Sequence, residues 1–167
     1  MKFFLNSKTT SHLRGLESEF GESTNGIRIE LNRLESAKLL SSHREGNKKL
    51  YCANRTHPLF DEIHNIVIKQ TGLDKVIESV VDKIGNLVSV YLVGDLARGI
   101  NTDAISLVLI GNDIDTEYLK RKVDQCERMV KRKVDYKIFD IAGANQYLLD
   151  FKPEEVLLLW NQNGNKN

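Results

Sequence analysis

The chain has 167 residues, 41% of them hydrophobic and 28% charged, which is typical of a globular protein with one domain or two small ones. No run of about eighteen apolar residues occurs, and the opening apolar stretch is too short for a signal peptide, so we expect a cytoplasmic protein without a membrane contact. Its two cysteines form no C-x-x-C motif, which excludes a disulfide framework.

Charge is distributed unevenly along the chain. The whole chain carries a net charge of +1, but residues 1–56 hold ten Lys or Arg against six Asp or Glu, and the remainder holds 14 against 17. A basic first third beside an acidic remainder indicates that the first third meets a polyanion.

The first third reads as two helices joined by a tight turn. Apolar spacing predicts helices over residues 11–20 and 23–40, with Gly21 ending the first and Ser23 capping the second. This order is typical of a helix-turn-helix, whose second helix enters the major groove of DNA. The polar face of that helix supplies the candidate base contacts, with Ser23 at its start: Ser23, Thr24, Asn25, Arg28 and Asn32. An ordinary amphipathic helix with a solvated face is the alternative.

A hairpin follows the second helix. Gly46 and Asn47 suit a tight turn between two short strands, and Arg44, Lys48 and Lys49 lie near its tip. Such lysines would contribute salt-dependent phosphate contacts. A surface hairpin with solvated charges is the alternative.

The residues from Glu30 to Leu40 and from Arg44 to Tyr51 resemble the winged helix of arsenic-repressor-type transcription regulators, and residues 53–60 extend the resemblance. The subfamily resembled here places this winged helix before a small nucleotidyltransferase-like domain. One departure is Lys38, which stands where the family usually has a glycine closing the helix.

The rest of the chain mixes helices with strands. The patterns predict helices over 60–71, 73–84, 115–131 and 144–150, and strands over 87–93, 105–110, 134–139 and 155–160. We therefore expect an α+β chain, with an N-terminal winged helix-turn-helix over 1–56, a helical connector over 57–72, and a small α/β nucleotidyltransferase-like domain with a mixed sheet over 73–167.

Residues 90–94 and 97–99 resemble the signature of minimal nucleotidyltransferase domains. In that family a Gly-Ser turn holds the triphosphate, and three aspartates hold two magnesium ions. Carried over to this chain, the signature falls on Gly94, Asp95, Arg98, Ala104, Ser106 and Asp135. Asp95 replaces the serine, and neither Ala104 nor Ser106 offers a carboxylate. Asp103 replaces one ligand only if the gap is placed elsewhere. The expectation is a degenerate site without catalytic residues, metal or cofactor.

The leading hypothesis is a DNA-binding transcription regulator, not an enzyme. It would bind double-stranded DNA as a homodimer, and its C-terminal domain would dimerise, bind a partner protein or sense a small-molecule effector. The alternative is a nucleotidyltransferase acting on a small molecule, protein or RNA. A third, weaker possibility is a purely protein-binding module.

Overall fold

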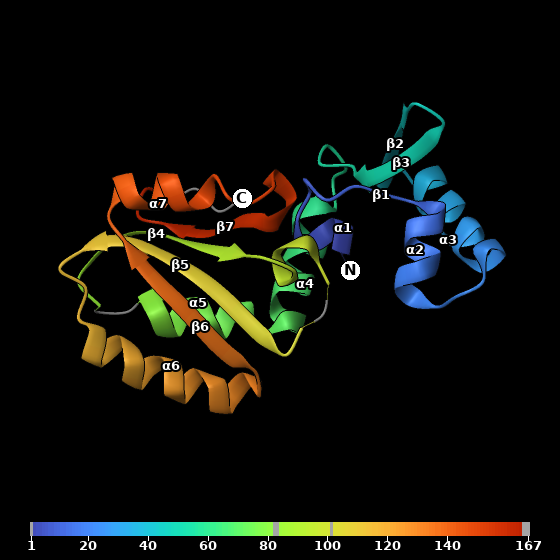
Figure 1. Ribbon diagram of the computed structural model, residues 1–167. Coiled ribbons are helices and arrows are strands. Elements are labelled where there is room, and N and C mark those ends of the chain that lie inside the picture. The colour runs from blue at the N-terminus through green and yellow to red at the C-terminus, as the bar shows by residue number, and fades with distance from the viewer. Residues whose placement is uncertain (1, 82–83, 101, 165–167) are drawn as a thin grey trace.

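The computed structural model describes residues 2–81, 84–100 and 102–164. The chain is an α+β structure with two sheets (Figure 1). Among the described residues, no helix combines the length and the apolar character needed to cross a membrane.

The N-terminal part holds two helices beside a small sheet. Its elements are α1 (Lys2–Leu5), β1 (Ser11–His12), α2 (Leu13–Phe20), α3 (Thr24–Ser36), β2 (Leu40–Glu45) and β3 (Lys48–Ala53). The three strands pair antiparallel in the order β1-β3-β2. The sheet lies beside α2 and α3 at one end of the molecule (Figure 1).

The predicted helix over residues 11–20 is wrong at its start. Ser11 and His12 are extended and pair with Tyr51 and Leu50 of β3, so α2 begins only at Leu13. Backbone pairing with a distant strand outweighs the local helical pattern here. Gly21 ends α2 in the left-handed conformation, as expected.

The predicted helix over residues 23–40 is too long. Ser23 caps α3 by accepting a hydrogen bond from the Gly26 N–H, but the helix ends at Ser36 and Leu40 already belongs to β2. Lys38 takes the left-handed conformation that the related glycine would supply, with φ of 58°. The Asn54 amide donates to the Lys38 carbonyl at 2.8 Å, which helps to hold this strained turn.

Two helices connect the small sheet to the large one. α4 (Phe60–Thr71) ends at Gly72, whose φ is +79°, and α5 (Leu73–Val81) follows directly. The helix predicted over 73–84 is too long, because Ile84 is not helical, and residues 82–83 lie outside the described residues.

The C-terminal part is built on a four-stranded mixed sheet. Its strands are β4 (Asn86–Val93), β5 (Ala104–Asn112), β6 (Lys133–Phe139) and β7 (Val156–Asn161), in the spatial order β6-β5-β4-β7. β4 pairs antiparallel with β5 and β7, whereas β5 and β6 are parallel and joined by α6 (Thr116–Val130). α5 and α6 cover one face of the sheet, and α7 (Ile141–Leu148) lies on the other (Figure 1).

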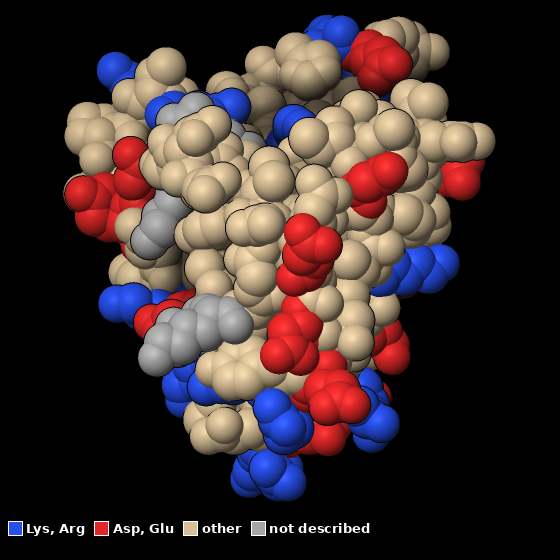
Figure 2. Space-filling model, turned by 90° about the vertical axis from the view of Figure 1, so that its left-hand side faces the viewer, with Lys and Arg blue, Asp and Glu red and all other residues tan. Residues whose placement is uncertain are grey.

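The face that Figure 2 shows carries charges of both signs. Acidic side chains are spread across its middle, and lysines and arginines gather at its lower edge, where α6 lies. A face of mixed sign attracts a polyanion less than a uniformly basic one.

One apolar core runs through both parts of the molecule. Buried residues from Phe3 in α1 to Leu159 in β7 belong to a single cluster. α1 packs against the C-terminal part closely: a Cβ added to Gly99 would lie 2.2 Å from the Lys2 Cα. The N-terminal segment therefore supports the turn that follows β4.

Candidate functional site

The turn after β4 has a backbone that its glycines determine. Gly94 ends the strand with φ of +82°, Leu96–Arg98 form one turn of 3-10 helix, and Gly99 follows with φ of +78°. The Arg98 N–H donates to the Asp95 carbonyl at 3.0 Å, which closes the turn. The loop thus turns sharply between β4 and the segment leading to β5. We refer to residues 94–99 as the Gly94 turn.

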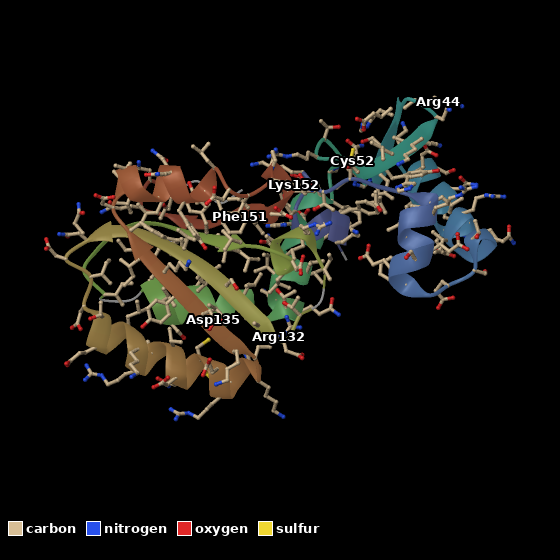
Figure 3. All side chains as sticks on the ribbon, viewed as in Figure 1. Arg44, Cys52, Arg132, Asp135, Phe151 and Lys152 are labelled. Carbon is tan, nitrogen blue, oxygen red and sulfur yellow. The ribbon has the colours of Figure 1, made fainter. Side chains whose placement is uncertain are left out.

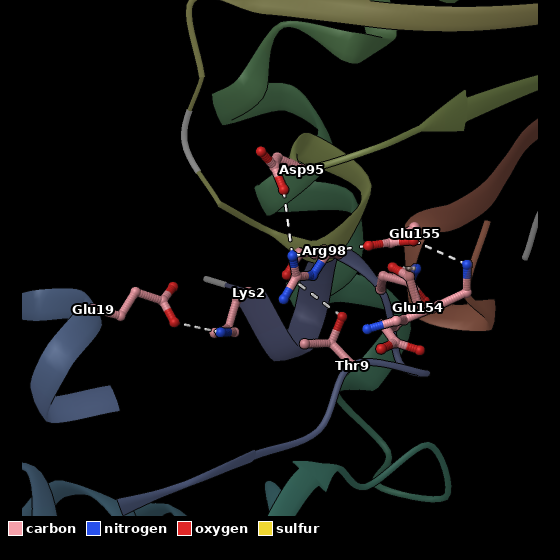
Figure 4. Close-up of polar contacts among 9 residues, drawn as sticks. Lys2, Thr9, Glu19, Asp95, Arg98, Glu154 and Glu155 are labelled. Carbon is pink, nitrogen blue, oxygen red and sulfur yellow. Dashed lines mark hydrogen bonds and ion pairs between the residues drawn. The ribbon is translucent and has the colours of Figure 1, made fainter. Parts of the chain in front are cut away.

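Arg98 is held on several sides (Figure 4). Its Nη1 lies 3.3 Å from Asp95 Oδ1 and 3.9 Å from Glu155 Oε1, and its carbonyl accepts a hydrogen bond from Thr9 Oγ1 at 3.5 Å. Two carboxylates therefore share one guanidinium. The negative charge of Asp95 is partly neutralised by Arg98 within the turn. These contacts hold the Arg98 side chain in place without a ligand.

The residues at the family's metal positions share one face of the sheet. Ser106 on β5 pairs in register with Asp135 on β6, and Ala104 is two residues earlier on the same face. Ile105 and Val134, which alternate with them, are buried on the helix side. The structure therefore brings Ser106 and Asp135 side by side, and Asp135 is exposed (Figure 3).

This face does not fit a pair of magnesium ions. Ala104 has no ligand atom, Ser106 has no charge, and Asp95 is paired with Arg98. Within the part of the chain that the structure describes, no three His, Cys, Asp or Glu side chains gather as a metal site. Magnesium prefers carboxylate and phosphate oxygens, so we derive no step through a metal.

A hollow lies between the polar face of α3 and the hairpin. Arg28 and Asn32 line it from the helix, and Lys48 and Lys49 line it from β3, around a volume of about 810 Å³. Sequence reasoning missed Arg14 of α2, which also lines it. Arg14 could have been identified as a candidate from its position in the basic first third of the chain.

The other predicted N-terminal residues lie elsewhere. Ser23 is engaged as the cap of α3, and Thr24 and Asn25 do not line the hollow. Arg44 is exposed on β2 (Figure 3) and pairs in register with Lys49. The structure thus gathers half of the predicted set in the hollow, and the other half does not line it.

Lys49 has a partner inside the protein. Its Nζ lies 2.7 Å from Glu35 Oε2 and 4.9 Å from the centre of the Tyr51 ring. The hydrogen bond to Lys49, with a second from the Ser42 hydroxyl, lowers the pKa of Glu35, and the same contact raises the pKa of Lys49. Lys48 makes no ion pair with any residue that the structure describes, so its charge is the more available of the two.

A second hollow joins the hairpin to the Gly94 turn. It has a volume of about 980 Å³, and its cations come from α1, β3, the turn and the segment before β7: Lys2, Lys48, Arg98 and Lys152. Lys2 is largely committed, because it is nearly buried and paired with Glu19 (Figure 4). Lys152 was not found from the sequence, because it is 104 positions away from Lys48.

Comparison with known proteins gives similarity to solved structures alone. No family model matches the chain, and no curated protein matches it either. A chain in a toxin–antitoxin crystal structure with AMP-PNP is 21% identical, and the match covers 53% of this chain and 73% of that one with a TM-score of 0.41. A variant of the MntA–HpeT toxin–antitoxin gives 21% identity, covering 54% and 72%, with a TM-score of 0.42.

A protein from Sulfolobus solfataricus described as a nucleotidyltransferase gives 23% identity over 60% of this chain and 87% of that one, with a TM-score of 0.41. Likeness at this level assigns no residue, substrate or partner to this chain.

These comparisons correct two predictions made from the sequence. The hypothesis of a DNA-binding transcription regulator with a non-catalytic C-terminal domain is wrong, because the matches favour its alternative, a nucleotidyltransferase. The prediction that the chain is not an enzyme is wrong on the same finding. It rested on the residue types at Asp95, Ala104 and Ser106.

Proposed function

We propose that this chain is a nucleotidyltransferase that acts on RNA. The observation that carries the proposal is the place of Arg98, which belongs to the Gly94 turn and also lines the cationic hollow beside the hairpin. A nucleotide at the turn would therefore meet an acceptor that lies in the hollow.

The reaction asks little covalent chemistry of the protein. An acceptor hydroxyl oxygen bonds to the α-phosphorus of a nucleoside triphosphate and gives its proton to the Asp135 carboxylate, while the bond from the α-phosphorus to the bridging oxygen breaks and pyrophosphate leaves. Arg98 and Lys152 supply positive charge for phosphates, and Asp135 is the one carboxylate of the family pattern that remains on the open face. We assign Asp135 to the acceptor side of the site.

The N-terminal part would hold the acceptor. We propose that residues 1–56 form a winged helix-turn-helix and that 57–72 connect it to the transferase domain over 73–167. The nucleic-acid contacts proposed from the sequence, which are Thr24, Asn25, Arg28, Asn32, Arg44, Lys48 and Lys49, then serve RNA. Support comes from the basic hollow between α3 and the hairpin, since a small uncharged acceptor would need no such surface.

The test is transfer of a labelled nucleotide. Each of the four α-labelled nucleoside triphosphates is incubated with the full chain, single-stranded RNA and magnesium. We expect labelled RNA with at least one of them, and a loss of about a hundredfold in the Asp135→Asn variant, as typical for one acid–base or charge-stabilising group. Asp124→Asn, on the exposed side of α6, is the matched control. Absence of labelled RNA with every nucleotide contradicts the proposal.

A homodimer remains a proposal supported by one surface. Leu59 and Ile66, on one side of the α4 segment, are 54% and 63% exposed, although both are large and apolar. Sedimentation of the full chain should show a dimer that Ile66→Lys converts to a monomer. A monomer at every concentration contradicts it.

A further inference from the structure

The two hollows of the N-terminal part meet at the hairpin, and we refer to them together as the groove. The hollow between α3 and the hairpin and the hollow between the hairpin and the Gly94 turn share three lining residues, His12, Asn47 and Lys48. Each has the volume of a small-molecule site, about 300–1,000 Å³ in general. Joined, they exceed what one nucleotide requires, so the groove suits an extended ligand.

Cations line this groove from end to end. The first hollow has four of them, Arg14, Arg28, Lys48 and Lys49, and no Asp or Glu among its described lining residues. At the other end lie Arg98 and Lys152. Three acids, Glu19, Glu45 and Glu154, line the second hollow, but Glu19 is already paired with Lys2. The groove therefore matches a ligand with repeated negative charge.

The shape favours one strand over a duplex. Alternation along β3 places Lys49 and Tyr51, which line the first hollow, on one face of the hairpin, and Leu50, which lines the second, on the other face. A ligand that touches both hollows has to turn around the hairpin tip, which a flexible single strand can do and a stiff duplex cannot.

We propose that a single strand of RNA lies along this groove, from Arg14 and Arg28, past Lys48 at the hairpin, to Lys152 and Arg98 at the Gly94 turn. The proposal rests on the proposed function for the position of the strand's end alone, which would be the acceptor. The side-chain amides of Asn32 and Asn47 line the groove and suit a 2′-hydroxyl, which distinguishes RNA from DNA.

The experiment measures binding without any nucleoside triphosphate. A fluorescent RNA of about twelve nucleotides, within the range of site sizes for single-strand grooves, is titrated with the full chain at several salt concentrations. Lys48→Ala and Lys152→Ala should each weaken binding about threefold to tenfold and lower the slope of log affinity against log salt by about 0.7. Lys120→Ala, exposed on α6 and outside the groove, should change neither. Circular dichroism confirms that each variant is folded.

Four results would overturn the proposal. They are no binding, an effect of Lys48→Ala without one of Lys152→Ala, tighter binding of a duplex than of the single strand, and equal affinity for DNA of the same sequence. A protein that binds RNA as expected but transfers no nucleotide would refute the proposed function and leave the groove intact, because this titration requires no transfer.

Discussion

Two short basic connections, the hairpin tip and the Gly94 turn, differ in what surrounds them. Gly46 at the tip has φ of +56° and no atom within 4 Å of an added Cβ, and Lys48 beside it is exposed. Gly99 has a similar φ of +78°, but α1 lies against it, and Arg98 is held by two carboxylates. At the tip, the exposed Lys48 side chain can adjust its position to a ligand. At the turn, the Arg98 side chain is held in one position before a ligand binds.

The largest effect should come from a methyl group at the packed turn. Gly99→Ala would place a Cβ 2.2 Å from the Lys2 Cα at a left-handed φ, so we expect a loss of about 3 kcal/mol or more in the free energy of unfolding. Gly46→Ala has the same conformational cost without the clash, and about 1 kcal/mol is expected. Urea denaturation of both variants makes the comparison, and equal losses would show that α1 does not support the turn.

A second effect should appear in nucleotide affinity. Asp95 places an anion in the turn where the family that residues 90–99 resemble has a serine, and it shares Arg98 with Glu155. Asp95→Ser removes that anion, so we expect binding of a nucleoside triphosphate to strengthen about tenfold, or about 1.4 kcal/mol. Titration calorimetry measures it. Asp103→Ser, which removes an exposed carboxylate just before β5, is the control and should change affinity less. Weaker binding by Asp95→Ser would contradict this role.

A smaller effect should follow from releasing Lys49 at the hairpin. Glu35→Gln removes its partner, so single-stranded RNA should bind about twofold to threefold more tightly, and stability should fall by about 0.5 kcal/mol, as for exposed ion pairs. Because the pKa of Glu35 is lowered in the folded chain, its contribution is present above the ordinary carboxyl pKa and is lost as pH falls through the lowered value. Unchanged RNA affinity would show that Lys49 does not touch the strand.

The smallest effect concerns the two thiols. Burial raises the pKa of Cys126, which is fully enclosed between α5 and α6, so it should resist a thiol reagent until the chain unfolds. Cys52 on β3 is half-buried beside the Ser41 hydroxyl and should react first. Counting labelled thiols with and without denaturant checks this. Two equally fast thiols would contradict the packing of α6.

The sequence predicted most elements but not all their ends. Period and capping placed α3, the hairpin and the four large-sheet strands within a few residues. The helices predicted at Ser11 and at Leu40 were wrong, because both residues belong to strands whose pairing partners lie further along the chain. Local pattern cannot report such pairing. Lys38 was identified as standing where the family has glycine, and the structure resolves that departure with a left-handed lysine.

The candidate site was predictable where its residues are close in sequence. Arg28, Asn32, Lys48 and Lys49 were placed near one another from one helix and the hairpin that follows it. Lys152 and Glu155 were missed, because only the return of β7 beside β4 brings them to the Gly94 turn. The error about function came from reading the residue types at Asp95, Ala104 and Ser106 as a loss of activity.

The most direct test labels the chain with a photoreactive azido derivative of ATP and maps the modified peptide. We propose that the nucleotide binds at the Gly94 turn, beside the groove that receives RNA. We expect the label on the peptide that contains residues 94–99, with competition by ordinary ATP and less labelling in Arg98→Gln. Labelling confined to peptides of α2 and α3, or none that ATP competes for, would contradict the account.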